Sequence, residues 1–489
     1  MYRLINMTSV MYNKSNVNKR DYNNVIKYFN NKFFNYSSIH SHVFSTLTTN
    51  NYSKKVIMIS LDWTRPKDPP LSLGHASILA NLQANDIDVT EKSWSVNHET
   101  FHIEDILHFI ESHSVFTMKT ITTVAIGVFV WNEQYVQSII HYLKQHKYRG
   151  QIILGGPQIS YVKTNIEKYY PNADIFIRGY AEDVLVKYLL SNDKYPVIQG
   201  IHYANQPSLN QSALSDLNHL PSPYLNGILK KQRFLRWETQ RGCPFRCSFC
   251  QHRESDSSQK RRSFPTLRIE KEIEWLVTDD IVQDIAVLDP TFNSGNNYLS
   301  ILEKFATLNY KGKISLQCRI EMVQPEFLQL VEEINKTGQV VLEFGIQTIH
   351  KQEQNFIQRP NNLTKIKTVL KETENKKIQT ELSLIFGLPG QTLQSFQESI
   401  DFCKSYNVST IHAFPLMLLR GTPLYDQKQE FGLIESSDNH LNHLKNIPRI
   451  TTNNISHVIS SPTFSYEDWL KMGEMADELE LSNVKKGYK

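Results

Sequence analysis

The chain has 489 residues, of which 40% are hydrophobic and 11% aromatic, enough for two or three domains with packed cores. No stretch approaches the roughly 18 consecutive apolar residues of a membrane span, so we expect a soluble protein. Residues 1–55 carry eight Lys and Arg and one acid, so the net charge of +4 leaves −3 for the remainder. A body that is not basic gives no reason to expect nucleic-acid binding.

Residues 1–52 are rich in Asn, Ser, Thr and Tyr and show no sustained hydrophobic period. This composition predicts a disordered, Asn-rich basic extension. A basic, hydroxyl-rich and acid-poor segment also fits a mitochondrial transit peptide. The five cysteines form no regular framework, which favours a reducing compartment. We therefore expect a cytoplasmic protein, with the mitochondrial matrix as the alternative.

Strands and helices alternate through residues 53–192. The expected strands are 55–60, 88–90, 124–130, 151–154 and 174–178, and the expected helices are 73–84, 103–110 and 134–146. Such alternation predicts an α/β domain with a Rossmann-like parallel sheet and crossover helices. Ligands of these sheets bind beyond the carboxyl ends of the strands, where Trp131, Gly155 and Gly156 fall. Glycines there would let a large ligand approach the backbone closely.

Residues 193–232 lack periodicity and contain Pro207, Pro221 and Pro223, so we expect a linker. The second domain, 233–425, alternates again between strands and helices. Its expected strands are 235–240, 285–289, 314–319, 340–347, 380–386 and 410–415, with helices at 268–278, 297–308, 324–336, 363–375 and 393–406. Six β/α units predict a partial (β/α)6 version of the eightfold TIM-like barrel. Residues 426–489 would form a small C-terminal extension.

Three cysteines follow the first strand of this domain within eight residues: Cys243, Cys247 and Cys250. Soft thiolate ligands suit zinc or an iron–sulfur cluster. Four ligands would close a structural zinc site, whereas three leave one position open to a substrate or cofactor. A zinc knuckle with His252 as the fourth ligand is therefore the alternative to a cluster.

The pattern Cys-x-x-x-Cys-x-Phe-Cys after a strand resembles the cluster motif of the radical S-adenosylmethionine (radical SAM) superfamily. The resemblance implies that the three cysteines hold a [4Fe-4S] cluster, whose fourth iron binds S-adenosylmethionine (SAM). Polar and apolar residues at the strand ends, together with one aromatic residue in the motif, resemble the family's SAM contacts. They are Phe249, Asp289, Arg319, Glu343, Gln347, Leu388 and Phe414.

The N-terminal half resembles the cobalamin (B12)-binding domain that precedes the radical core in one large radical SAM class. The implied cobalamin contacts are Leu73, Gly74, Trp131, Gly155, Gly156 and Glu182. The motif Asp-x-His-x-x-Gly, which supplies a histidine to the cobalt in many cobalamin proteins, is absent from the sequence. Cobalamin would then bind without a protein histidine, and we expect Trp131 to face the lower side of the cobalt.

The family resemblance implies an enzyme that receives one electron from an external donor of the flavodoxin or ferredoxin type. The leading hypothesis is methylation of an unactivated carbon on an unknown substrate. One alternative is a cobalamin-dependent cyclase or ring-forming oxidase of tetrapyrrole or natural-product type. Another is a non-catalytic regulator that binds zinc or cobalamin. A methylthiotransferase is disfavoured, because its additional cluster needs three more cysteines and residues 1–242 contain none.

Overall fold

The computed structural model describes residues 53–117, 120–162, 164–207, 211–252, 261–436 and 455–485. Residues from Ser53 onward form one compact unit. The extension predicted for residues 1–52 lies outside the described residues. No helix in the described ranges is both long and apolar enough to cross a membrane.

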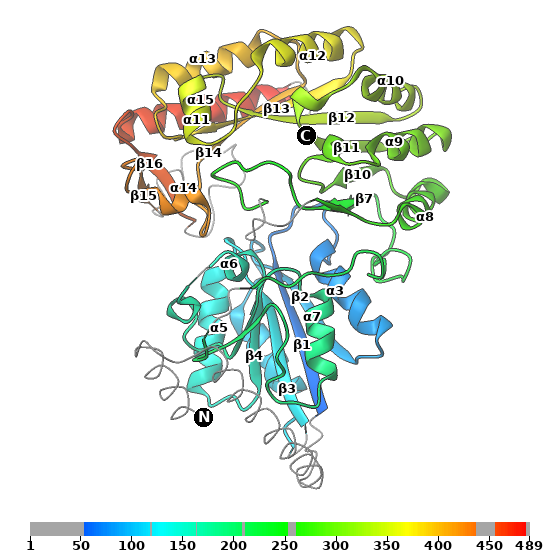
Figure 1. The fold of residues 1–489 in the computed structure, drawn as a ribbon, viewed down its shortest axis with the longest axis vertical. Helices are drawn as coiled ribbons and strands as arrows, with labels where there is room; N and C mark the ends of the chain where they lie inside the picture. Colours follow the sequence, from blue (N-terminus) through cyan, green and yellow to red (C-terminus); the bar gives the residue numbers. More distant parts are fainter. Residues whose placement is uncertain are drawn as a thin grey trace, which may run out of the picture. The chain divides into compact units, whose positions relative to one another are not determined.

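The first sheet contains six strands in the order β2-β1-β3-β4-β5-β6 (Figure 1). Its strands are β1 (Ser53–Asp62), β2 (Val89–Ser95), β3 (Thr120–Gly127), β4 (Gln151–Gly155), β5 (Ile175–Ile177) and β6 (Ile201–Tyr203). The first five pair in parallel, whereas β6 pairs antiparallel with β5 and closes that edge. This sheet is the Rossmann-like domain that the sequence predicts.

Helices cover both faces of the first sheet. They are α3 (Leu73–Ala84), α4 (Ile103–His113), α5 (Glu133–Gln145), α6 (Pro157–Ser160) and α7 (Glu182–Leu190). The side chains of β1 alternate between the faces: Ile57 and Ile59 pack with α4 and α5, and Val56 and Met58 pack with α3 and α7 (Figure 1). A parallel sheet buried on both faces explains the continuous apolar runs in its strands.

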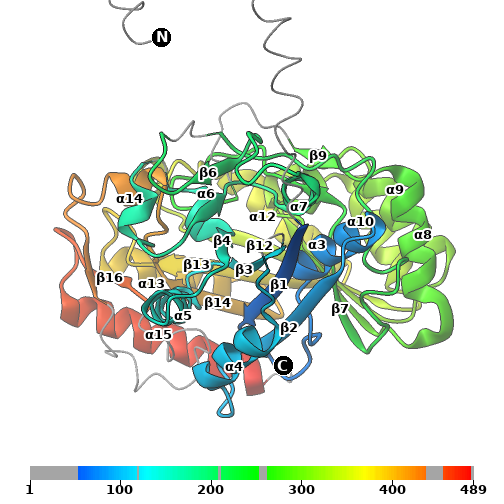
Figure 2. The same ribbon diagram turned by 90° about the horizontal axis from the view of Figure 1, so that it is seen from below.

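The second sheet has the order β14-β13-β12-β11-β10-β7, with every neighbouring pair parallel. Its strands are β7 (Phe234–Trp237), β10 (Asp284–Val287), β11 (Lys313–Cys318), β12 (Gln339–Gln347), β13 (Gln379–Phe386) and β14 (Thr410–Pro415). Five long helices lie along its outer side (Figures 1 and 2): α8 (Thr266–Val277), α9 (Tyr298–Thr307), α10 (Pro325–Ile334), α12 (Leu363–Asn375) and α13 (Leu393–Lys404). The expected partial barrel is confirmed.

Burial alternates along the barrel strands. In β13, Thr380, Leu382 and Leu384 are buried under the helices, whereas Glu381 and Ser383 are half-buried on the opposite, inner face. A helix-covered outer face and a more open inner face produce this period of two. The polar residues of the inner face are thereby available to a ligand.

Shorter elements complete the chain. These are the hairpin of β8 (Gln240–Arg241) and β9 (Arg262–Ser263), α11 (Lys351–Phe356), α14 (Pro423–Asp426), β15 (Ile434–Ser436), β16 (His457–Ser460) and α15 (Tyr466–Lys485), with 3-10 turns at Ile166–Lys168, Thr278–Asp280, Phe292–Ser294 and Ile320–Met322. Helix α15 packs beside β14, the edge strand of the second sheet. There the Asn483 amide donates to the Ile411 carbonyl at 2.9 Å and accepts from the Ile411 N–H at 3.2 Å.

The segment 193–232, expected to be a linker, contributes to both packed bodies. It contains β6, the antiparallel edge of the first sheet. Further along, Leu217, Leu220 and Tyr224 are buried in the apolar core of the second sheet. The sequence of this segment, with four prolines and no hydrophobic period, gave no signal for these contacts, because single residues make them rather than one face of a helix or strand.

Candidate functional site

The cysteine loop (residues 242–252) begins where the first barrel strand ends. Strand β7 is anchored by Trp237, which is buried and donates its indole N–H to Glu272 Oε2 at 2.7 Å. Two residues of β8 then pair with β9 before Gly242, whose φ of 86° lies in the left-handed region. Such a φ favours glycine, so the chain can turn sharply into Cys243. Barrel chemistry collects at this end of the strands.

The start of the loop is fixed by Asp289, which follows β10. Its carboxylate accepts the backbone N–H groups of Thr239 at 2.8 Å and Gln240 at 3.2 Å, and the Thr239 hydroxyl at 2.5 Å. The side chain is completely buried, and burial raises its pKa to about 7 against the effect of these donors. Asp289, predicted to lie near the SAM amino group, is thus also a clamp on the approach to Cys243.

Two further barrel segments hold the middle and end of the loop. The Ser248 N–H donates to the Ile357 carbonyl at 2.9 Å, just after α11. The Ser248 carbonyl accepts the Leu424 N–H at 3.0 Å, and Gln251 Nε2 donates to the Arg420 carbonyl at 3.0 Å. The loop is therefore held by segments that follow β10, β12 and β14, which span the width of the second sheet.

Each cysteine of the motif has a distinct setting. Cys243 and Cys250 are half-buried and Cys247 is buried. The Cys243 Sγ lies 3.7 Å from Thr291 Oγ1, the Cys247 Sγ lies 3.9 Å from Arg359 Nη1, and the Cys250 Sγ accepts the His252 backbone N–H at 3.4 Å. Each of the three sulfur atoms thus has a polar or cationic neighbour from the surrounding chain.

The donor set fits a cluster better than a single ion. Within the part of the chain that the structure describes, no group of three or more His, Cys, Asp or Glu side chains is placed to hold one metal ion. A structural zinc requires four ligands that converge tetrahedrally on one point. Thiolates that bind separate irons of a [4Fe-4S] cluster surround a larger body instead. His252 is exposed, and its backbone N–H donates to the Cys250 sulfur.

Arg319 also packs on the cysteine loop. Its guanidinium lies 4.3 Å from the centroid of the Phe245 ring, while Nε pairs with Glu321 at 3.1 Å and Nη2 donates to the Pro360 carbonyl at 2.6 Å. Burial and the neighbouring Arg359 lower the pKa of Arg319. Two guanidinium groups thus stand on one side of the loop, where they favour a carboxylate ligand such as that of SAM.

The remaining predicted SAM contacts lie around the same end of the barrel. Glu343 and Gln347 are half-buried on the inner face of β12, and Gln347, with a φ of 66°, follows a bulge in that strand. Phe414, on β14, is half-buried and stacks on His412 at 5.8 Å. Leu388, however, is completely buried in the core.

Phe249 and the turn after β13 are positioned by packing and by one side-chain amide. Phe249 is half-buried against the barrel core. Gly387 and Gly390 adopt φ values of 87° and 76°, which close the turn. The Gln391 Oε1 accepts the backbone N–H of Gly387 at 2.7 Å and that of Leu388 at 3.1 Å. Gln391 was not predicted, yet it fixes this turn.

The glycines predicted to contact cobalamin lie at the carboxyl edge of the first sheet. The Gly155 carbonyl accepts the Val128 N–H at 2.8 Å, so the ends of β3 and β4 stay together. Gly156 has a φ of 89°, and a Cβ there would stand 2.8 Å from the Val128 carbonyl oxygen. Only glycine fits this turn without strain. At the start of α3, Leu73 is buried and Gly74 is exposed with open space around it.

Trp131 lies at the same edge. It is half-buried, stacks on Phe129 with ring centroids 4.5 Å apart, and donates its indole N–H to the Leu61 carbonyl at 3.2 Å. These contacts tie the segment after β3 to the end of β1. The ring therefore has a fixed orientation, and its place below the cobalt stays a prediction.

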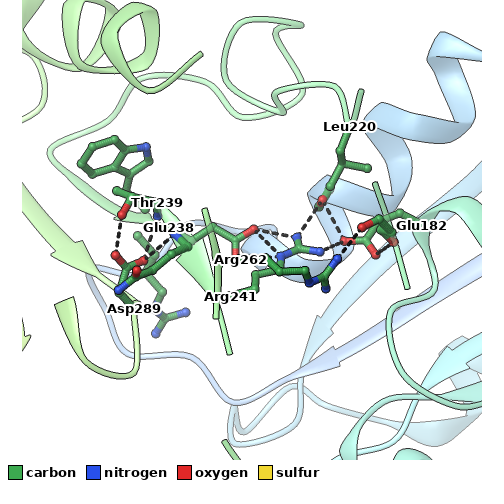
Figure 3. Close-up of polar contacts among 12 residues, drawn as sticks. Glu182, Leu220, Glu238, Thr239, Arg241, Arg262 and Asp289 are labelled. Carbon is green, nitrogen blue, oxygen red and sulfur yellow. Dashed lines mark hydrogen bonds and ion pairs between the residues drawn. The ribbon is translucent and has the colours of Figure 1, made fainter. Parts of the chain in front are cut away.

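Glu182, predicted as a cobalamin contact, is buried in a polar network (Figure 3). Its carboxylate pairs with Arg241 Nη1 at 2.7 Å and accepts the hydroxyls of Ser77 at 3.1 Å and Ser215 at 2.8 Å. Burial acts to raise the pKa of Glu182, but the Arg241 guanidinium and the hydrogen-bond donors to the carboxylate together outweigh it, and the pKa is lowered. Contact with cobalamin stays a prediction, and the ion pair gives this carboxylate a separate role.

Sequence reasoning missed three arginines: Arg241, Arg359 and Arg420. Arg359 approaches Cys247 across 112 positions of sequence, and Arg420 pairs with Glu133 across 287. No local pattern marks such distant partners. Arg241 could have been singled out more easily than the other two arginines. It is a cationic residue in a strand-like run, two positions before Cys243.

Comparison with known proteins places this geometry in a family. Residues 237–403 match the model of the radical SAM superfamily. The cobalamin-dependent radical SAM methyltransferase TokK of Streptomyces tokunonensis is 25% identical over 336 residues, which are 63% of this chain and 49% of that protein. A 2-(S-pantetheinyl)-carbapenam-3-carboxylate methyltransferase of Streptantibioticus cattleyicolor is 25% identical over 325 residues, 61% of this chain and 47% of that protein. The chain spans about half the length of these curated relatives.

The fold is also similar to a solved structure. The radical SAM methyltransferase TsrM from Kitasatospora setae, with cobalamin and a [4Fe-4S] cluster bound, superposes with a TM-score of 0.65 at 13% sequence identity. The similarity covers 86% of this chain and 91% of that one, so it includes both sheets. Residues 237–403 therefore match the radical SAM superfamily, and the chain as a whole shares the fold of this cobalamin-bound radical SAM methyltransferase.

Proposed function

We propose that the protein is a cobalamin-dependent radical SAM enzyme that methylates an unactivated carbon of its substrate. The observation that carries this proposal is the cysteine loop, held rigidly at the carboxyl end of the partial barrel by Asp289, Ile357 and Leu424. The first sheet, with its glycine turn at its own carboxyl edge, supplies a place for a second large cofactor. The curated relatives named above, both methyltransferases, support methylation.

Cys243, Cys247 and Cys250 would hold the [4Fe-4S] cluster and leave its fourth iron to SAM. Arg319 and Arg359 would attract the SAM carboxylate, since a guanidinium fork matches a carboxylate well. Glu343 and Gln347, half-buried on the inner face of β12, would accept or donate hydrogen bonds to the rest of the cofactor. Their positions on a strand rather than a mobile loop favour precise orientation.

Cobalamin would lie at the carboxyl edge of the first sheet. Gly156, pressed against the Val128 backbone, leaves no side chain between the sheet and a ligand. Trp131 would face the cobalt, held by its bond to the Leu61 carbonyl. Because the sequence lacks Asp-x-His-x-x-Gly, no histidine of that motif would coordinate the metal.

The cluster held by Cys243, Cys247 and Cys250 would supply one-electron reduction of SAM, and a cobalamin at the carboxyl edge of the first sheet would supply methyl transfer. The electron would come from a flavodoxin- or ferredoxin-type donor. We place the reaction in a reducing compartment, the cytoplasm, with the mitochondrial matrix as the alternative. The protein itself orients the cofactors and excludes water.

Anaerobic purification with added iron, sulfide and cobalamin tests the proposal. Electron paramagnetic resonance (EPR) of the reduced protein should show a [4Fe-4S]+ signal, and mass spectrometry should detect cobalamin and 5′-deoxyadenosine. S-adenosylhomocysteine and a methylated product would separate a methyltransferase from a cyclase, which would release 5′-deoxyadenosine alone. A protein that takes up only zinc, with no cluster signal, would contradict the proposal and favour a regulator.

A further inference from the structure

A buried ion bridge connects the first sheet to the approach of the cysteine loop. Arg241 Nη1 pairs with Glu182 at 2.7 Å, and Arg241 Nη2 pairs with Glu238 at 2.6 Å (Figure 3). The Arg241 and Glu182 side chains are only 7% and 6% exposed. One guanidinium therefore bridges two carboxylates that come from different domains.

The bridge is closely surrounded by other groups. Ser77 and Ser215 donate to the two Glu182 oxygens, so that carboxylate is satisfied without water. The Tyr180 ring lies between two guanidinium groups, with Arg241 at 5.0 Å and Arg262 at 5.1 Å from its centroid. A buried charge with several fixed partners adds little net stability but specifies geometry strongly.

The position of the bridge in the chain makes its geometry relevant to the cofactors. Glu182 begins α7, in the segment that follows β5 at the carboxyl edge of the first sheet. Arg241 stands two residues before Cys243, separated from it by Gly242 with its left-handed backbone. A rigid path of a few residues thus joins the expected cobalamin edge to the first cysteine.

A second ion pair also joins the two domains, but it does not lead to Cys243. Arg420, after β14, pairs with Glu133 at the start of α5, with Nη1 to Oε1 at 2.8 Å. It also joins the two domains, and its side chain is 18% exposed. It contacts the far end of the cysteine loop only through its backbone carbonyl, which accepts from Gln251. Loss of its side chain removes a domain contact without removing the link to Cys243.

We propose that Arg241 is a positioning residue that sets the distance and orientation between the cluster and cobalamin through its bridge to Glu182 and Glu238. The inference rests on the proposed function, because it concerns the placement of those two cofactors. It assigns Glu182 to domain alignment, whereas the resemblance to the family assigned it to cobalamin. Arg241 itself touches neither cofactor in this proposal and acts through the cysteine loop.

The test uses the full chain loaded anaerobically with both cofactors. In wild-type protein, the reduced cluster and cob(II)alamin each carry an unpaired electron, so their magnetic interaction in EPR reports their separation and orientation. Arg241→Ala should keep both cofactors but lose the wild-type interaction, and added guanidinium ion should restore it by filling the vacated site. Arg420→Ala should keep the wild-type interaction.

Glu182→Gln provides a second variant, since an amide of the same size removes the charge and leaves one oxygen to accept a serine hydroxyl. It should show the same altered interaction as Arg241→Ala. An unchanged interaction in both variants would overturn the proposal, as would cluster loss in Arg241→Ala that guanidinium does not reverse. Wild-type protein that binds no cluster or no cobalamin would instead refute the proposed function, so the two failures can be told apart.

Discussion

The backbone N–H of Thr239 donates to the Asp289 carboxylate at 2.8 Å, and this bond ties the first barrel strand to the second at the threshold of the cysteine loop. Because the carboxyl group is completely buried, its ionised form is disfavoured and its pKa rises to about 7 from a usual value of 3.8. The pKa of a group that holds the cysteine loop therefore lies close to neutral pH.

Asp289→Asn should remove a pH dependence of stability. Between about pH 4 and pH 7 the folded protein binds more protons at this position than the unfolded chain, so stability falls as the pH rises. The asparagine variant lacks this loss, and its stability relative to wild type should rise by a few kcal/mol across the window, at about 1.4 kcal/mol for each pKa unit. Thermal unfolding of both proteins at pH 5 and pH 8 measures the difference; equal differences at the two values would contradict it.

Cys247→Ala should abolish both the cluster absorbance and the formation of 5′-deoxyadenosine, because a cluster cannot be held by the two remaining thiolates. The matched control is Cys403→Ala on α13, where a completely buried thiol has its pKa raised to about 12 by burial. That variant should bind the cluster normally and lose only about 1 kcal/mol of stability from the small cavity. Iron and sulfide analysis after anaerobic reconstitution reads the outcome, and a cluster retained in Cys247→Ala would refute the assignment.

Trp131→Ala should change cobalamin occupancy or the cobalamin spectrum while the cluster stays intact. The substitution removes the stack on Phe129 and the bond to the Leu61 carbonyl, for a loss of about 1 to 3 kcal/mol in unfolding free energy. Phe116→Ala, which removes an edge-to-face contact with Tyr148 before β3 begins, is the control. It should lower stability with cobalamin binding unchanged. Identical cobalamin spectra in all three proteins would dismiss a role for Trp131.

His412→Gln should reveal a second pH dependence of stability. Here the folded protein favours the charged form of the side chain, whereas at Asp289 it favours the neutral form. Burial lowers the pKa of His412, but the carboxylates of Glu381 and Glu480 raise it more, to about 9. The stabilisation is present below the ordinary value of 6.5 and is lost as the pH rises through 9. The advantage of wild type over the variant, a few kcal/mol by the same conversion, should shrink between pH 6 and pH 9.5.

The control for that experiment is His219→Gln. His219 pairs with Asp216 on the surface, and its side chain is 85% exposed. Exposed pairs contribute little, so this variant should follow wild type at every pH. A pH-independent difference between His412→Gln and wild type would show that Glu381 and Glu480 do not hold a proton on the ring.

Elements with a strong local signal were predicted closely from the sequence. The helix Leu363–Asn375 and the strand Thr410–Pro415 occupy the expected positions, because apolar period and flanking turn residues agree there. The strand β6 was missed, since three residues beside a proline-containing stretch give no period. The strand β6 forms because it pairs with the edge of β5, and this pairing cannot be recognised from the local sequence.

The residues of the candidate site also form two groups: those that a local sequence pattern identifies, and those that only folding brings together. The three cysteines stand within eight residues and carry their own chemistry, so spacing alone singled them out. Arg359 near Cys247, and Glu182 opposite Arg241, become neighbours only through the folded chain. Such partners are fixed by tertiary packing, which neither propensity nor hydrophobic period describes. The position of Asp289 at a strand end was predicted from the sequence, but the two backbone N–H groups that donate to its carboxylate were not.

The amide of Asn483 forms both hydrogen bonds that a neighbouring strand would offer to Ile411. A half-barrel leaves its last strand without a partner, and a bare strand of this kind invites another chain to pair with it and begin a fibril. One side chain from a helix blocks that addition here. The barrel thus stays open for large cofactors, while its edge strand β14 is protected from pairing with another chain.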